Sequence, residues 1–296
     1  MSEEKNPWWL WPGLLSLDAP LVAVAWLYMF ASAWQVNYLP WPAYATLGVS
    51  VWVVYVIDRL LDQKLRSPKD PLVGERHRFH HRHRKGFLGG VAIAILILLW
   101  LVFFAVPGEL LRFYLMPGIV LVVVFFILVM SSPDTREIPF IRNLVAGAAF
   151  SFGTSMMAHV YVPTQGVESL IISREMIAFG VLCAVNITAI HLWEHSRLSD
   201  DPDVKSAMEG LLTMLLTIVG ASALVYAYLQ NPNMFSSDLE GDTYRARPFF
   251  YAILITSALF LVINKNRHRF SLEALRTLAD LAMIVPLPLF LILSRG

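Results

Sequence analysis

Nine long apolar blocks divide this 296-residue chain, and they restrict it to folds that suit a membrane. A helix needs roughly 20 apolar residues to cross the hydrocarbon core of a bilayer. Because lipid offers no hydrogen-bond partners, a spanning segment must satisfy its backbone internally, as a helix does. The blocks therefore predict nine transmembrane helices, at approximately 15–34, 41–61, 87–106, 110–131, 143–162, 174–194, 207–229, 247–264 and 275–294.

Composition favours the same fold class. Only 15% of the residues are charged, whereas a soluble domain carries about a quarter, and the mean hydropathy is +0.59. The single cysteine, Cys183, excludes a disulfide framework and a four-cysteine zinc site. The acidic start, with Glu3 and Glu4, is unlike a signal peptide, so the first apolar block is expected to remain as a helix. We predict an all-α, polytopic membrane bundle that forms one domain over residues 1–296. Membrane lipids are expected as partners, and nucleic acid is not.

Lysine and arginine are distributed unevenly between the predicted loops. With the N-terminus on the cytoplasmic side, 18 of the 23 Lys and Arg residues fall in inner segments. Cytoplasmic loops of membrane proteins carry such an excess. The bias predicts a multi-pass protein of the cell membrane with a cytoplasmic N-terminus, and an odd number of spans then places the C-terminus outside.

Two acidic residues mark the inner end of the second predicted helix. Asp58 and Asp62 are four residues apart, so a helix turns both carboxylates to one side. A carboxylate at the bilayer edge is costly unless it is paired, hydrated or bound to a cation. In one interpretation Asp62 simply pairs with Arg66, one turn later. In the other, the two carboxylates hold Mg²⁺, which binds through one or two carboxylates plus substrate phosphates, and the basic residues downstream meet those phosphates.

Other polar residues inside the apolar blocks include Asp18, His159, Asn186 and Asp280, and because burial there is expensive each is a functional candidate. Asp18 is expected to cap the first helix, because it precedes a proline. Asp280 is expected to pair with Arg276, one turn earlier. His159, near the outer end of its helix, is expected at the membrane interface. Asn186, in the middle of its helix, is predicted to line a cavity.

The acidic segment resembles a family signature. Residues 58–72, DRLLDQKLRSPKDPL, are similar to the first aspartate-rich signature of the UbiA superfamily of intramembrane prenyltransferases. Residues 16–20, SLDAP, resemble the start of that family's first helix, and residues 142–153, RNLVAGAAFSFG, resemble its fifth. The family also has nine helices and a cytoplasmic N-terminus. Val54 and Tyr55 stand where the family has an Asn-Asp pair.

The resemblance implies an activity: Mg²⁺-dependent transfer of an isoprenyl group from a prenyl diphosphate to an aromatic or other lipophilic acceptor, at a site facing the cytoplasm. The family's second aspartate-rich signature corresponds to residues 186–203, where Glu194 can take the role of an acidic ligand. The metal ligands implied are Asp58, Asp62, Glu194 and Asp200, of which the first three are also the catalytic candidates. The substrate-binding candidates are Arg59, Arg66, Arg142, Asn186 and His191.

Other interpretations stay open. Residues 191–195, HLWEH, match the H-x-x-E-H pattern of a zinc protease class, although no third ligand is placed in sequence. Residues 75–85, ERHRFHHRHRK, form a predicted loop that anchors on anionic lipid, holds a metal through its histidines, or covers a cavity and attracts a diphosphate. The Val54-Tyr55 departure motivates a different function, a catalytically inactive UbiA-like protein that binds an isoprenoid lipid or a membrane partner. A transporter has no support from an inverted repeat.

Overall fold

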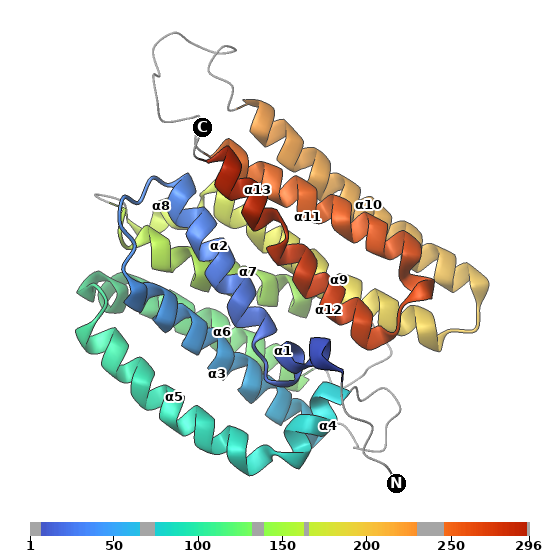
Figure 1. The fold of residues 1–296 in the computed structure, drawn as a ribbon, viewed down its shortest axis with the longest axis horizontal. Helices are drawn as coiled ribbons and strands as arrows, with labels where there is room; N and C mark the ends of the chain where they lie inside the picture. Colours follow the sequence, from blue (N-terminus) through green and yellow to red (C-terminus); the bar gives the residue numbers. More distant parts are fainter. Residues whose placement is uncertain (1–6, 66–74, 132–138, 163–165, 230–245, 295–296) are drawn as a thin grey trace.

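The computed structural model describes residues 7–65, 75–131, 139–162, 166–229 and 246–294, and within these ranges it holds helices and no strand. The long helices lie side by side along one common direction (Figure 1). The elements are η1 (Trp8–Leu10), α1 (Trp11–Leu14), α2 (Asp18–Ala33), α3 (Trp41–Leu65), α4 (Glu75–Arg82), α5 (Arg84–Phe104), η2 (Leu110–Tyr114), α6 (Leu115–Ser131), α7 (Phe140–His159), α8 (Val167–Ile171), α9 (Arg174–Leu198), α10 (Pro202–Leu229), α11 (Arg247–Asn266), η4 (Arg267–Arg269), α12 (Leu272–Ile284) and α13 (Pro286–Leu293).

The described helices confirm the all-α membrane class. Seven of them are long and apolar enough to cross a membrane, and an eighth candidate is a bent pair in which Trp8–Leu14 meets Asp18–Ala33 at 80°. Helix α7 fills the block predicted at 143–162, but it is not among these candidates. Its first turn contains Arg142 and Asn143, and several Ser and Thr residues follow, which makes it less apolar than the others.

The bend between α1 and α2 turns the N-terminal segment across the end of the bundle. Ser16 adopts φ 57°, in the left-handed region that residues with a side chain seldom occupy. Trp52 of α3 donates its indole N–H to the Leu15 carbonyl at 2.9 Å. Trp8 and Trp11 are exposed, as expected of aromatic residues at a membrane–water interface. The bend thus leaves α1 at the interface while α2 enters the bundle.

Helices α7 and α9 approach each other closely at Gly147. A Cβ atom at this position would lie 2.6 Å from both the Ala184 nitrogen and the Gly180 oxygen. Small residues permit such backbone contact between membrane helices. One turn further along α7, Ser151 donates its hydroxyl to the Met176 carbonyl of α9 at 2.6 Å. These contacts hold the polar side chains of the two helices in fixed register.

Residues 75–85 were predicted as a loop, and the structure corrects this: they form α4 and the first turn of α5. The helix is amphipathic in an unusual sense, because the face that turns into the bundle is polar. Arg76 and His80, four residues apart, are both buried, whereas Arg78 and His81 are exposed. A buried polar face is stable only when partners on other helices compensate it.

Candidate functional site

The predicted carboxylate pair lies near the C-terminal end of α3. Asp58 is half-buried. The side chain of Asp62 and the whole of Arg66 lie outside the described residues, so the metal pair predicted there stays a prediction. Among the side chains that the structure describes, no group of three or more His, Cys, Asp or Glu is arranged to hold a metal ion.

Arg59, which follows the first of these carboxylates, turns into the bundle and is buried. Its Nη1 donates to the Gly13 carbonyl at 2.6 Å and to the Ser16 hydroxyl at 2.7 Å, and its Nη2 lies 3.5 Å from the Asp18 carboxylate. Arg59 thereby closes the turn between α1 and α2. A substrate diphosphate would have to compete with these three partners for the predicted contact.

Two arginine side chains contact the carboxylate of Asp18. Its Oδ1 accepts the backbone N–H of Ala19 at 3.0 Å, but Asp18 is the first residue of α2 and not its cap as expected, because the N-cap position is Leu17. Its Oδ2 lies 3.5 Å from Arg59 and 3.0 Å from Arg76. The single carboxylate therefore joins α2 to both α3 and α4.

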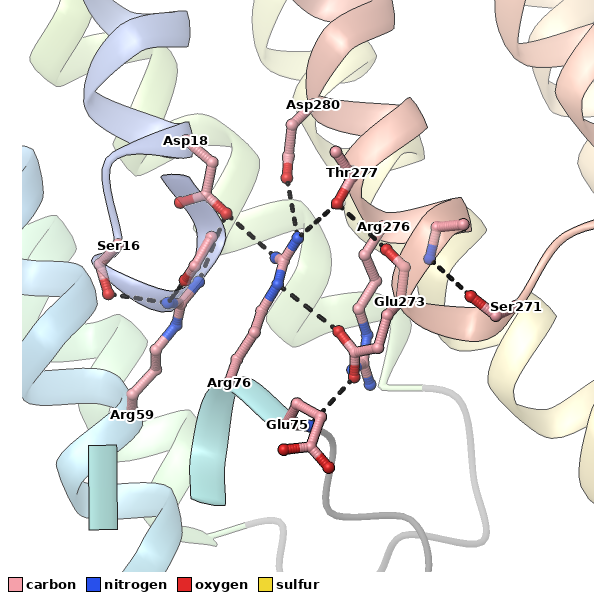
Figure 2. A network of polar contacts seen from close by, with 12 residues as sticks. Ser16, Asp18, Arg59, Glu75, Arg76, Ser271, Glu273, Arg276, Thr277 and Asp280 are labelled. Atoms are coloured by element: carbon pink, nitrogen blue, oxygen red, sulfur yellow. Dashed lines mark hydrogen bonds and ion pairs between the residues drawn. The ribbon is translucent and has the colours of Figure 1, made fainter. Parts of the chain in front are cut away.

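Arg76 is the centre of the buried charge network (Figure 2). Its guanidinium reaches from α4 to Asp18 on α2 and to Asp280 and Glu273 on α12, at 3.0, 3.5 and 3.7 Å. It also donates to the Thr277 hydroxyl at 3.4 Å. Burial by itself lowers the pKa of Arg76, but the three carboxylates outweigh it and raise that pKa above its ordinary value. Arg76 therefore remains a cation and links three helices.

The network continues along α12 to α9. Arg276 donates to Glu194 at 2.5 Å and to Glu273 at 2.8 Å. The predicted acidic ligand Glu194 is thus already ion-paired. Asp280 was expected to pair with Arg276, and this was wrong: Asp280 faces Arg76, because Arg276 is drawn to the other two carboxylates.

Positive and negative groups alternate along the whole network, which runs from α3 to α9. Charges inside a membrane protein pair in this way because each would otherwise pay a large desolvation cost. The path joins the start of the first predicted motif, at Arg59, to Glu194 in the predicted counterpart of the second. Its members are Arg59, Asp18, Arg76, Asp280, Glu273, Arg276 and Glu194.

His80 attaches α4 to the same turn in its neutral form. Its Nδ1 lies 2.8 Å from the Arg76 carbonyl, which can only accept, so Nδ1 carries the proton. Its Nε2, at 3.1 Å, then accepts from the Ser16 hydroxyl, whose oxygen accepts in turn from Arg59. The ring stacks on Phe87 at 4.0 Å. Burial, with the nearby Arg59 charge, lowers the pKa of His80 to about 4.

This lowered pKa predicts acid sensitivity. An unfolded His80 binds a proton near pH 6.5, whereas the folded protein resists it down to about pH 4. The free energy of unfolding is therefore expected to fall with decreasing pH between these values, by up to about 1.4 kcal/mol per pH unit, and to be independent of this group above pH 6.5. Unfolding midpoints measured across pH 4–7 test this. The slope should be shallower in His80→Gln, with the exposed His81→Gln as control, and equal slopes in all three proteins would contradict the assignment.

A second polar group joins α7 to α9. Arg142 Nη2 lies 3.2 Å from His191 Nε2, and Asn143 Nδ2 lies 3.1 Å from the Thr188 hydroxyl and 3.2 Å from His191 Nδ1. The structure thus brings together two of the predicted substrate-binding residues, Arg142 and His191. It adds Asn143, which is fully buried and whose Oδ1 has no hydrogen-bond partner among the described residues. Such an oxygen can accept from a ligand or a water.

The remaining candidates are dispersed. Asn186 is half-buried, and its Oδ1 also has no hydrogen-bond partner in the described part of the chain. Asp200 is exposed between α9 and α10. His159, the last residue of α7, is buried among its neighbours, 2.7 Å from the Tyr114 hydroxyl and 3.1 Å from the Ser169 hydroxyl, and its place at the membrane interface stays a prediction. Hydrogen bonds on both ring nitrogens make this burial possible.

The central residue of the network, Arg76, was not singled out from the sequence, and neither was Glu273. A signal was present: Arg76 and His80 share one helical face through their four-residue spacing. The density of basic residues in this segment obscured that pattern, because every helical face carries charge.

Comparison with known proteins gives no match to a family model, to a characterised protein or to a solved structure. The fold and the site therefore define the class of protein but not a family. The chain is an α-helical membrane protein whose helices are tied together by buried ion pairs.

Proposed function

We propose that the chain is an integral membrane prenyltransferase of the UbiA type, with nine spans, a cytoplasmic N-terminus and a reaction site at the cytoplasmic face. One observation carries the proposal. The two segments that resemble the family's acidic signatures, on α3 and α9, are connected by the unbroken series of ion pairs from Arg59 to Glu194. Segments that are far apart in sequence are thus linked, through residues of α2, α4 and α12, to one buried network, and this favours a shared site.

The chemistry of the residues fits a divalent metal at α3 better than at α9. Two carboxylates at positions 58 and 62 of one helix match the oxygen ligands that Mg²⁺ prefers. Glu194 would first have to leave Arg276. When bound, Mg²⁺ would neutralise the diphosphate and so favour its departure from the isoprenyl carbon.

The chain's own residues would bind and orient the substrate. Arg142 of α7, held beside His191 of α9, presents a guanidinium group that can donate to phosphate oxygens, whereas Asn143 Nδ2 is already shared between Thr188 and His191. The rings of Tyr55 and Phe150, 6.4 Å apart, belong to helices α3 and α7 and could shelter an allylic cation. A carboxylate of the site would take up the proton that the acceptor loses.

Transfer of a labelled isoprenyl group tests the proposal directly. The purified protein in detergent should transfer label from radiolabelled prenyl diphosphates to lipophilic acceptors in the presence of Mg²⁺, and chelation should stop the reaction. Asp62→Asn and Glu194→Gln should each lower the rate roughly a hundred-fold or more. Glu109→Gln, at an exposed position just before η2 and outside both signature segments, is the matched control and should keep full activity. No transfer and no diphosphate binding with any chain length would refute the proposal.

A non-catalytic alternative has its own observation. Glu194 and Asp18 are both engaged by arginines, which is the arrangement of a structural network. On this alternative the protein binds an isoprenoid lipid or another membrane partner without turnover. Binding of a prenyl diphosphate that is unaffected by chelator and is never followed by release of diphosphate would favour it.

A further inference from the structure

The junction between α4 and α5 carries a compact exposed cationic surface. Residues 81–86 are all exposed, and they include Arg82, Arg84 and Lys85 within four positions. Arg78, one turn earlier, is also exposed but is paired with Glu75 at 3.0 Å. The proposed prenyl transfer at the buried network does not use these cations, because the face of α4 that enters the bundle is the opposite one.

The position of this cationic surface relative to the bilayer follows from α5 itself. Helix α5 is a candidate span of which little is buried in the bundle. From Leu88 onward its outward side chains are apolar and exposed, for example Ile93 and Leu96. The exposed surface therefore changes from basic to apolar within three residues, between Lys85 and Leu88. This change places the three cations at the level of the phospholipid headgroups, directly above the lipid chains that cover α5.

The helix surface just below the cations is open. Gly86 and Gly89 lie one turn apart on α5, and a Cβ added at either would meet no atom within 4 Å. A lipid's glycerol region can thus approach the α5 backbone next to Lys85. At Gly90, by contrast, an added Cβ would lie 3.1 Å from the Trp52 ring of α3, so this glycine serves helix packing.

The cations are also held in place. Arg76 and His80 fix the inner face of α4 through the buried charge network, and Trp11 of α1 packs edge-on against Phe79 at 6.1 Å. Helices α1 and α4 lie next to each other in Figure 1. A surface whose backbone is fixed loses little entropy when it binds a headgroup.

From this geometry we infer that the α4–α5 junction is a binding site for an anionic phospholipid of the surrounding membrane. The phosphate and the headgroup charge lie against Arg82, Arg84 and Lys85, and the acyl chains lie along the exposed apolar side of α5. The site is separate from the proposed prenyl transfer, and it stands or falls independently of it.

Lipid titration of the full chain tests the site. The purified protein in a neutral detergent would be titrated with phosphatidylglycerol or with phosphatidylcholine of the same acyl chains, and binding followed by native mass spectrometry. We expect the anionic lipid to bind the wild type at least ten-fold more tightly. Arg84→Gln/Lys85→Gln should weaken anionic-lipid binding roughly thirty-fold, since each cation near the surface contributes about a factor of five.

A matched variant separates a site from a general charge effect. Lys265 and Arg269 are exposed at the end of α11 and in η4, so Lys265→Gln/Arg269→Gln removes the same charge elsewhere and should keep the preference. Inorganic phosphate at the lipid concentration should not displace the lipid. Equal losses in the two double variants, an unchanged preference in Arg84→Gln/Lys85→Gln, or displacement by phosphate alone would each overturn the proposal.

Discussion

Replacement of Arg76 by methionine should destabilise the protein by about 3–5 kcal/mol, the cost of removing one partner from a buried ion pair. Methionine keeps most of the side-chain volume but leaves Asp18, Glu273 and Asp280 without the cation that faces all three. Mutual repulsion of these carboxylates then adds to their desolvation. Unfolding of the detergent-solubilised protein by heat or by added sodium dodecyl sulfate, followed by tryptophan fluorescence, measures the loss.

Helix α4 offers a matched control for this effect. Arg78 lies two residues away, is exposed, and pairs only with Glu75, so Arg78→Met should cost about 0–1 kcal/mol. In the double variant Arg76→Met/Asp280→Asn one uncompensated charge is gone, and this protein should be more stable than Arg76→Met alone. If Arg76→Met were as stable as Arg78→Met, the buried network would not be a stabilising element.

The second large effect is expected at Gly147. A Cβ there would stand 2.6 Å from backbone atoms of α9, and backbone cannot move aside as a flexible side chain can. Gly147→Ala should therefore force α7 and α9 apart and cost about 2–3 kcal/mol. The separation also moves Arg142 and Asn143 away from His191, so any diphosphate affinity should fall together with the unfolding midpoint.

Gly153 of the same helix is the control. A Cβ at Gly153 meets nothing within 4 Å, so Gly153→Ala should leave stability unchanged or raise it by up to about 1 kcal/mol through helix propensity. The same unfolding measurement compares the two variants. A Gly147→Ala protein that is as stable as Gly153→Ala would mean that the contact of α7 with α9 is looser than described.

Local patterns in the sequence predicted most of the helices. The block at 174–194 became α9, and the block at 41–61 became the apolar part of α3. Each lies in a run of apolar residues whose length is set by the bilayer, so a window of about 20 residues contains the necessary information. The block at 15–34 was less accurate, because its helix begins only at Asp18, after the bend.

The site depended on contacts that no local pattern reveals. Arg76 is 58 positions from Asp18, and Arg276 is 82 positions from Glu194. At sequence level the nearest opposite charge is the obvious partner, and for Asp280 this gave the wrong one. In the folded chain the choice among several possible partners depends on which helices pack together, and that depends on small residues such as Gly147 as much as on the charges themselves.

The buried charge network has a consequence for how the chain enters the membrane. Asp18 enters the membrane early in synthesis, at the start of α2, and its partners Arg59 and Arg76 follow soon afterwards. The charges of α12 are inserted last, and their partners are then already present on α4 and α9. Retention of the C-terminal helices in the bilayer is thus coupled to correct assembly of everything before them. If the N-terminal half misfolds, the charges of α12 lack their partners and this helix is only weakly stable in the bilayer. Such a chain would then be exposed to membrane quality control.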